Sequence, residues 1–245
     1  MALYRYVKSD PTYSRRKKAP IILSLFFISA GVILLFWVGW PIVAFSMFSE
    51  ALFAGTVSPI SESTSQTRPS LPAVVLAADE AISPVSGGLT NANAWFPTMP
   101  QKKVVTPVNT YTVTIPKLDI KDITAIIGGS DLSKSLIHYG GTGLPGEYGN
   151  AVIFGHSTLP QFFSPKNYTS IFSTLPTMEQ GDDIFVRYDG VNYRYRVFQM
   201  TVLDPTDLSL LEQRFDDSYV TLVTCVPPGT YWKRLYVTAR LVRPN

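Results

Sequence analysis

The longest apolar run in this chain constrains its fold more than any other feature. Residues 21–48 are 28 consecutive positions without a formal charge, and about 20 apolar residues are enough for a helix to cross a hydrocarbon core of about 30 Å. The run is therefore predicted to be a transmembrane helix. A cleaved signal peptide is the alternative, but such a signal has a shorter apolar region of about 7–15 residues and then small residues at a cleavage site. That pattern does not follow directly after Phe48.

Basic residues gather on one side of this run. Residues 1–20 carry six Lys and Arg against one Asp, although the net charge of the whole chain is only +3. By the positive-inside rule, residues 1–20 are predicted to be a cytoplasmic tail and everything after the span to lie outside the cell membrane. Trp37 and Trp40 suit the outer interface, where Pro41 would kink or end the helix. Because the basic excess lies in the tail, no nucleic-acid-binding surface is expected.

The segment after the span has a different composition. In residues 56–72, 11 of 17 positions are Ser, Thr or Pro, which leaves too few apolar side chains to offset the entropy of ordering the chain. Residues 49–105 are therefore predicted to be a mostly disordered linker. It would connect the membrane helix to a folded module, residues 106–245, that is long enough to bury a hydrophobic core.

The folded module is predicted to be mainly β. Turn residues separate its apolar runs, and Asp189-Gly190 between two alternating runs is typical of a two-residue hairpin. Short helices are predicted at residues 131–137 and 207–214, which begin with capping residues. Strands at this spacing indicate a compact barrel or sandwich with small helices in its loops. The runs rich in β-branched and aromatic residues are 111–115, 151–154, 184–188, 193–203, 219–224 and 234–242.

Three chemically active side chains fall at the ends of predicted strands. Cys225 ends one run and Arg234 opens the next, so an antiparallel hairpin would place them opposite each other. His156 follows the end of another run. A nearby cation favours the thiolate, a His can exchange protons with an amine, and a guanidinium can stabilise an oxyanion. Together these residues could perform acyl transfer.

The same residues also have ordinary structural explanations. A lone Cys is often a small buried hydrophobe, a His at a strand end is often a turn residue, and an Arg that opens a strand is usually solvated. The chain has one Cys and two His, which excludes an internal disulfide and makes poor material for a zinc site. Neither a metal nor a cofactor is expected.

Several sequence motifs resemble those of sortases. Residues 221–225, T-L-V-T-C, resemble the sortase signature T-L-x-T-C. Residues 150–156, N-A-V-I-F-G-H, resemble the strand that carries the catalytic His of that family, and residues 233–237, K-R-L-Y-V, resemble the strand that carries its catalytic Arg. Residues 144–150 and 181–195 are also similar to sortase sequence, so the resemblance extends over nearly the whole folded module.

The resemblance implies an eight-stranded sortase-type β-barrel and a membrane-anchored cysteine transpeptidase. It implies that Cys225 attacks the Thr–Gly bond of an LPxTG-like sorting signal, that His156 protonates the departing amine, and that Arg234 orients the substrate and supports the oxyanion. Thr224, from the same motif as the thiol, would bind substrate near the oxyanion. His138 matches no catalytic position and is expected to be structural or exposed.

The resemblance also implies the partners. The acyl donors would be surface proteins that bear a C-terminal sorting signal, and the acceptor would be an amine such as a peptidoglycan precursor or a pilin lysine. The product would be a protein attached to the cell wall or surface.

Three other functions stay open from the sequence. An L,D-transpeptidase also combines Cys, His and Arg, but its usual S-x-G-C run is absent because Thr224 precedes Cys225 where Gly would be expected. A catalytically idle tethered module could bind wall peptides or a partner protein. A cysteine peptidase would release the acyl group to water, and an added amine would not redirect its product.

Overall fold

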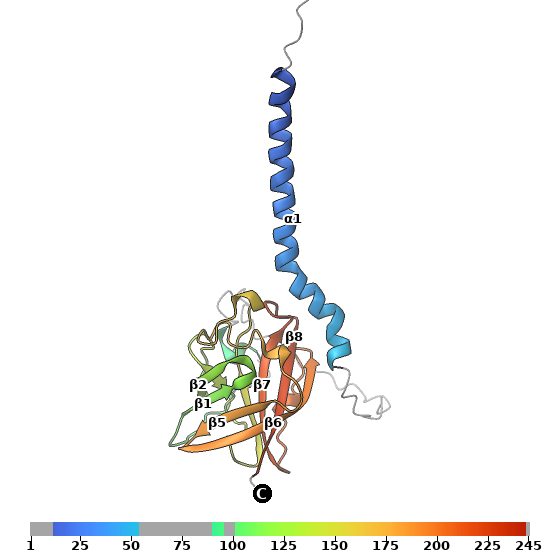
Figure 1. The fold of residues 1–245 in the computed structure, drawn as a ribbon. Helices are drawn as coiled ribbons and strands as arrows, with labels where there is room; N and C mark the ends of the chain where they lie inside the picture. Colours follow the sequence, from blue (N-terminus) through green and yellow to red (C-terminus); the bar gives the residue numbers. More distant parts are fainter. Residues whose placement is uncertain (1–11, 54–89, 96–100, 244–245) are drawn as a thin grey trace, which may run out of the picture.

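The computed structural model describes residues 12–53, 90–95 and 101–243 of the chain. These residues form one long helix and a β-barrel (Figure 1). Residues 1–11 of the predicted basic tail lie outside the described part of the chain. So do residues 54–89 and 96–100 of the predicted linker.

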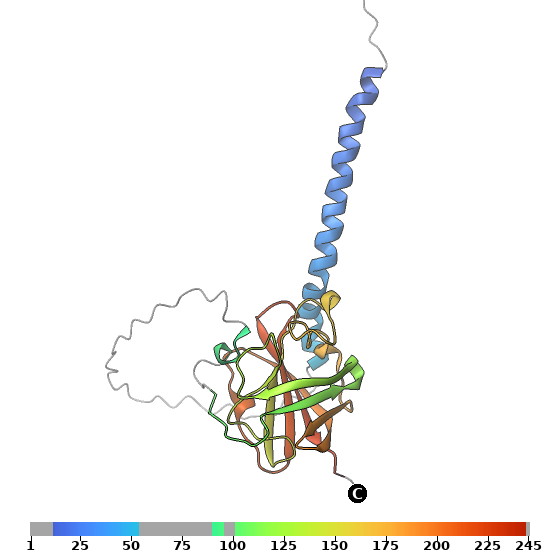
Figure 2. The same cartoon turned by 90° about the vertical axis from the view of Figure 1, so that its left-hand side faces the viewer.

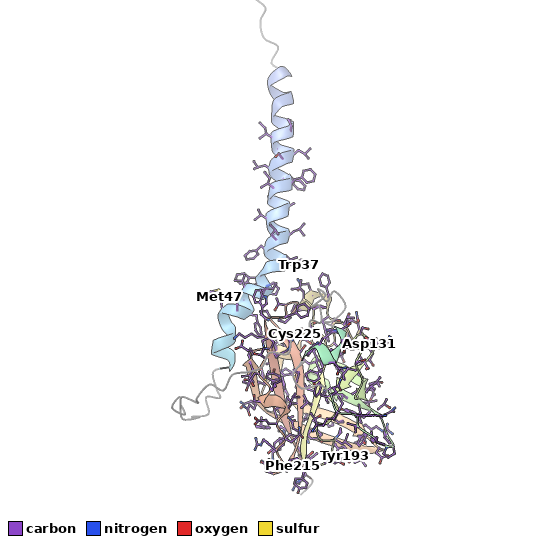
Figure 3. All side chains as sticks on the ribbon, turned by 180° about the vertical axis from the view of Figure 1, so that it is seen from behind. Trp37, Met47, Asp131, Tyr193, Phe215 and Cys225 are labelled. Carbon is purple, nitrogen blue, oxygen red and sulfur yellow. The ribbon has the colours of Figure 1, made fainter. Side chains whose placement is uncertain are left out.

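Helix α1, Thr12–Phe53, contains the long apolar run. Its segment Pro20–Met47 is long and apolar enough to cross a membrane, with a mean hydropathy of 2.7, and is not buried against the rest of the protein. Pro41 lies inside α1 and does not end it. Figure 1 shows α1 bending towards its C-terminal end, and Figure 3 places Trp37 near the bend, as expected where a proline removes a backbone hydrogen bond.

Eight strands close into a barrel, which confirms the predicted fold class. Their order around the barrel is β1-β2-β3-β4-β7-β8-β6-β5. Two neighbouring pairs, β2–β3 and β4–β7, run parallel, and the other six ladders between the described strands are antiparallel. The strands are β1 (Thr110–Ile115), β2 (Ile120–Ile127), β3 (Leu136–His138), β4 (Gly149–Phe154), β5 (Asp183–Tyr188), β6 (Val191–Leu203), β7 (Ser218–Val226) and β8 (Lys233–Leu241).

Short 3-10 helices lie before β1 and in the segments that connect the strands. They are η2 (Ala92–Ala94), η3 (Pro116–Leu118), η4 (Pro160–Phe162), η5 (Leu175–Thr177) and η6 (Ser209–Leu211). The predicted hairpin between β5 and β6 is confirmed: Asp189 and Gly190 have φ values of 49° and 75°, the left-handed conformation that two-residue hairpin turns require.

The two predicted loop helices differ from the structure. The helix predicted at residues 131–137 is wrong, because the Asp131 carboxylate accepts a hydrogen bond from the Ser133 backbone N–H at 3.0 Å and forms a turn. The following residues then pair with β2 and β4 as strand β3. A side chain that bonds its own backbone offers the chain an alternative to the helix. The helix predicted at residues 207–214 is reduced to η6.

Two hydrophobic clusters lie on opposite faces of the sheet formed by β4, β7 and β8. One fills the barrel and includes Leu222 and Val237. The other covers the outer face and includes Val223 and Tyr236. Because successive side chains of a strand point to opposite faces, Cys225 belongs to the outer cluster. Figure 2 shows the short segment 90–95, in teal, against the side of the barrel.

Candidate active site

Cys225 and Arg234 face each other across the ladder between β7 and β8. The antiparallel register pairs them directly, and Arg234 Nη1 donates a hydrogen bond to Cys225 Sγ at 3.2 Å. Both side chains are buried, with 1% and 5% of their surface exposed. The hairpin pairing predicted from the sequence is therefore confirmed, and the thiol has a fixed cation beside it.

His156 is brought to the same place by the parallel strand β4. The register pairs Phe154 with Val223, so two residues further along, where both strands end, His156 comes level with Cys225. Neighbouring strands lie about 4.8 Å apart. Gly155 is needed at the bend before the histidine, because a Cβ there would collide with the Phe172 ring. Strand order thus brings a thiol, a guanidinium and an imidazole to adjoining strand ends.

Two hydrogen bonds attach the loop of His156 to the strand of Cys225. Ser157 Oγ donates to the Cys225 carbonyl oxygen at 2.7 Å, and Thr224 Oγ1 donates to the Gly155 carbonyl oxygen at 2.9 Å. Ser157, in the first bond, directly follows His156 in the chain, and Gly155, in the second bond, directly precedes it. The imidazole of His156 and the thiol of Cys225 are therefore positioned by side chains that flank them.

Thr224 occupies a different position from the one expected for a substrate-binding residue. It is fully buried and alternates with Cys225 along β7, so its side chain faces the barrel interior. Its hydroxyl bonds the Gly155 carbonyl. The sequence analysis did not single out Ser157, although it directly follows the histidine in the chain.

Trp95 covers the group formed by Cys225, His156 and Arg234. The guanidinium Cζ of Arg234 lies 4.6 Å from the centroid of the indole ring, within the range of a cation–π contact. The imidazole of His156 meets the same ring edge-on, with 6.1 Å between the centroids. Trp95 itself is 4% exposed. Part of the predicted linker is therefore ordered and contributes to the site.

The segment that carries Trp95 is bound to the barrel through its backbone. Ala92 N–H donates to the Ser130 carbonyl oxygen at 2.8 Å, and Leu132 N–H donates to the Thr90 carbonyl oxygen at 2.9 Å. Sequence reasoning missed Trp95. The signal that could have found it is the aromatic pair W-F at residues 95–96, directly after the run of small residues N-A-N-A.

Burial determines whether the thiol of Cys225 and the imidazole of His156 are charged while Trp95 covers them. It raises the pKa of Cys225 to about 11, against the opposing influence of Arg234. Burial also lowers the pKa of His156, and the charge of Asp131 opposes this shift. A neutral thiol and a neutral imidazole are therefore the main forms near pH 7 while Trp95 covers the site. Among the described residues, His156 Nε2 and Arg234 Nε have no hydrogen-bond partner.

The second histidine is part of the fold. His138 is fully buried. Its Nδ1 lies 2.8 Å from the Tyr111 hydroxyl and its Nε2 lies 3.2 Å from Thr142 Oγ1. Burial lowers its pKa to about 4, so the ring is neutral near pH 7. In the part of the chain that the structure describes, no three His, Cys, Asp or Glu side chains form a group that could hold a metal ion.

A model of the Sortase domain matches residues 113–242, which is more than half of the chain and includes all three side chains of the site. The chain belongs to the sortase family. The resemblance predicted from the motifs is therefore confirmed. The matched residues of this sortase do not include Trp95.

Solved sortase structures are similar to this chain. Sortase C1 from Streptococcus agalactiae is 27% identical, with a TM-score of 0.50 over 61% of this chain and 78% of that chain. A lid mutant of sortase A from Corynebacterium diphtheriae is 28% identical, with a TM-score of 0.48 over 58% and 74%. A sortase D5 transpeptidase from Clostridium perfringens is 24% identical, with a TM-score of 0.48 over 58% and 83%. A comparison with curated proteins gave no match.

Proposed function

We propose that this sortase is a membrane-anchored cysteine transpeptidase that cleaves an LPxTG-like sorting signal between Thr and Gly and transfers the acyl group to an amine. The observation that carries the proposal is the placement of Cys225, Arg234 and His156 at adjoining ends of β7, β8 and β4. The family membership supports a transpeptidase in general.

The first half-reaction forms a thioester. When the site opens, the thiol of Cys225 gives its proton to the neutral imidazole of His156, and the resulting thiolate attacks the carbonyl carbon of the Thr residue, which gives a tetrahedral intermediate with a negative oxygen. Arg234, which already donates to the sulfur, is close enough to stabilise that oxygen, because a guanidinium keeps its charge and presents several fixed donors. His156 gives a proton to the Gly nitrogen as the C–N bond breaks. An amine leaves and a thioacyl enzyme stays.

The second half-reaction reverses these roles. His156, now neutral, takes a proton from the incoming amine, whose nitrogen attacks the thioester carbon. The C–S bond breaks, the sulfur leaves as a thiolate beside Arg234, and a new amide bond links donor and acceptor. Thr224 acts in this scheme as a positioning residue, because its hydroxyl holds the backbone next to His156 and does not face the outer side of the sheet.

Donor binding requires that Trp95 move away from the site. Burial is the largest cause of the raised pKa of Cys225, so exposure of the thiol removes that cause. The influence of Arg234, which lowers the pKa, then remains. Opening therefore favours the thiolate at the moment when a donor can reach it.

The proposed organisation follows the predicted membrane topology. Residues 1–20 form a cytoplasmic tail, residues 21–48 cross the cell membrane, residues 49–105 link the helix to the barrel, and residues 106–245 form the catalytic domain outside the cytoplasm. The candidate span Pro20–Met47 supports this organisation. The acyl donors are surface proteins with a C-terminal sorting signal, and the acceptor is an amine of the wall or of a pilin.

The test uses the full-length chain in detergent, a panel of LPxTG-like peptides, and intact-mass measurement with and without an added amine. We expect an acyl adduct on Cys225 that disappears on addition of the amine, with formation of the amide product. Cys225→Ala should give neither adduct nor product and keep the circular dichroism spectrum of the wild type. Full turnover by Cys225→Ala would refute the mechanism.

The remaining outcomes distinguish the alternatives. No adduct with any peptide, from a folded protein whose thiol also resists alkylation, would favour the idle binding module. Release of the acyl group to water at a rate that the amine does not change would favour a peptidase.

A further inference from the structure

Exposed aromatic side chains gather on two loops at one end of the barrel. Phe162 of η4 is 61% exposed, and Tyr231 and Trp232, directly before β8, are 46% and 63% exposed. The two loops touch, because a Cβ added at Gly229 would lie 3.1 Å from the Leu159 side chain. We refer to the surface formed by the three exposed rings as the aromatic rim. Phe and Trp side chains are mostly buried in soluble proteins, so their exposure together indicates a contact surface.

The fold holds both loops of the aromatic rim in fixed turns. Phe163 packs against the core of the barrel, whereas the preceding residue, Phe162, is exposed. The Phe162 N–H donates to the Leu159 carbonyl oxygen at 2.9 Å, which closes the turn of η4. In the other loop, Thr230 Oγ1 donates to the Pro227 carbonyl oxygen at 2.8 Å. The exposed rings are therefore presented by ordered loops.

The aromatic rim lies at the end of the barrel that also carries Cys225. Trp232 directly precedes β8, and the start of β8 pairs with the end of β7. Phe215, another exposed aromatic residue, lies before the start of β7. Since β7 has nine residues, its two ends are about 30 Å apart. Figure 3 shows Cys225 near the bend of α1 and Phe215 at the opposite end of the barrel.

Helix α1 brings this end of the barrel close to the membrane. Trp40 is predicted to lie at the outer interface, and Phe45, five residues later in α1, packs against the core of the barrel. Helix α1 also contacts β6. Five helical residues rise about 7.5 Å, and the headgroup layer on each side of a bilayer is about 5–8 Å thick. The contact between α1 and the barrel therefore begins where the headgroups end.

We propose that the aromatic rim inserts into the outer headgroup layer of the cell membrane, so that the end of the barrel with Cys225 rests on the bilayer. The inference rests on the membrane topology of the proposed function and adds an interaction surface to it. Trp and Tyr are enriched at membrane interfaces, because one part of the ring is apolar and another part is polar. Such insertion requires no charge on the lipid, so a neutral lipid is a sufficient partner.

The test measures how deep the aromatic rim lies, with the full-length chain in phosphatidylcholine vesicles. The chain has one Cys, so Cys225→Ala provides a background in which one introduced Cys carries a nitroxide label. Trp232→Cys and Phe162→Cys place the label on the two loops. The matched control is Phe215→Cys at the opposite end of the barrel, where the native side chain is 72% exposed.

The first reagent is a water-soluble nickel chelate, present on both sides of the membrane. We expect its collision rate with the two loop labels to be about fivefold lower than with the control label, because interfacial groups lie about 5–10 Å into the boundary between headgroups and acyl chains. A circular dichroism spectrum equal to that of the wild type shows that each labelled chain is folded. Equal nickel collision rates at all three positions would overturn the inference.

Oxygen is the second reagent and distinguishes the bilayer from a protein contact. Oxygen is apolar and concentrates in the bilayer, so it should collide more often with the loop labels than with the control label. Low collision rates with both reagents would mean that protein covers the loops, for example a second copy of the chain, and would also overturn the inference.

These measurements do not depend on activity, because the labelled chains lack the nucleophile. Loop labels that the chelate reaches freely, together with a wild type that forms the thioacyl enzyme, would overturn the inference while the proposed function stands. Immersed loop labels, together with a wild type that forms no thioacyl enzyme, would support the inference and refute the proposed activity.

Discussion

Two buried histidines on neighbouring strands differ in whether their ring nitrogens have hydrogen-bond partners. His138 ends β3 and His156 follows β4, which pairs with β3. Both ring nitrogens of His138 lie within hydrogen-bond distance of a hydroxyl group. In the described part of the chain, Nε2 of His156 has no such partner. Burial alone therefore does not identify a functional side chain here; a buried polar atom that the fold leaves unpaired is the better indicator.

The largest expected effect comes from replacing the unpaired histidine. His156→Gln should lower turnover at least about 1000-fold, because it removes the proton donor and acceptor of both half-reactions. It should change the free energy of unfolding by less than about 1 kcal/mol. The matched control, His138→Gln, should cost about 2 kcal/mol of stability, since it disturbs two hydrogen bonds of a buried ring. Equal stability losses in the two variants, measured by urea unfolding, would contradict the comparison.

A large effect is also expected at Arg234. Arg234→Lys keeps the positive charge but loses the planar set of donors, so turnover should fall about 100-fold with little change in stability. Arg240 is the matched control on the same strand, because its Nε bonds Asp217 away from the site. Arg240→Lys should keep wild-type turnover. Wild-type kinetics of Arg234→Lys would show that the planar donor geometry is dispensable.

The covering residue is expected to have a smaller effect. Trp95→Ala should expose the thiol and raise the rate of its alkylation by iodoacetamide at pH 7.5 about tenfold, because it removes part of the burial that disfavours the thiolate. Trp232→Ala is the control, since Trp232 is 63% exposed. An alkylation rate equal to that of the wild type, followed by mass spectrometry, would show that Trp95 does not limit access to Cys225.

The smallest expected effect is a pH dependence of stability. The pKa of His138 is about 4 in the folded protein, below the ordinary value of about 6.5, so the unfolded chain binds the proton first. Its contribution to stability is complete above pH 6.5 and is lost as the pH falls towards 4. The melting temperature should therefore decrease over this range, and less so in His138→Gln. An identical decrease in both proteins would assign the effect to other groups.

Sequence patterns predicted the strands that carry the site but missed two others. The alternation of apolar and polar residues in β2 is interrupted at Lys121 and Asp122, and Asp122 has a φ of 50°. The sequence of β2 therefore lacks the pattern that predicts a strand. Strand β3 has three residues and exists because β2 and β4 lie on either side of it. Such an element is set by tertiary pairing, which no local pattern records.

The candidate site was predictable to the extent that it depends on local pairing. Cys225 and Arg234 meet because a hairpin joins them, and the sequence predicts hairpins well. No local pattern predicted the position of Trp95, because its burial depends on contacts with residues far along the chain. The interior position of Thr224 follows from strand alternation, which the family motif alone did not convey.

The bonds around the thiol also differ in how far along the chain they reach. The bond from Arg234 to Cys225 joins residues 9 positions apart, whereas the bond from Ser157 to Cys225 joins residues 68 positions apart. Closing the longer loop costs more entropy and depends on the parallel pairing of β4 and β7. During folding of the complete chain, the hairpin of the thiol and the guanidinium can therefore form before the imidazole is placed. The complete group of thiol, guanidinium and imidazole is therefore assembled late in folding, when the barrel closes.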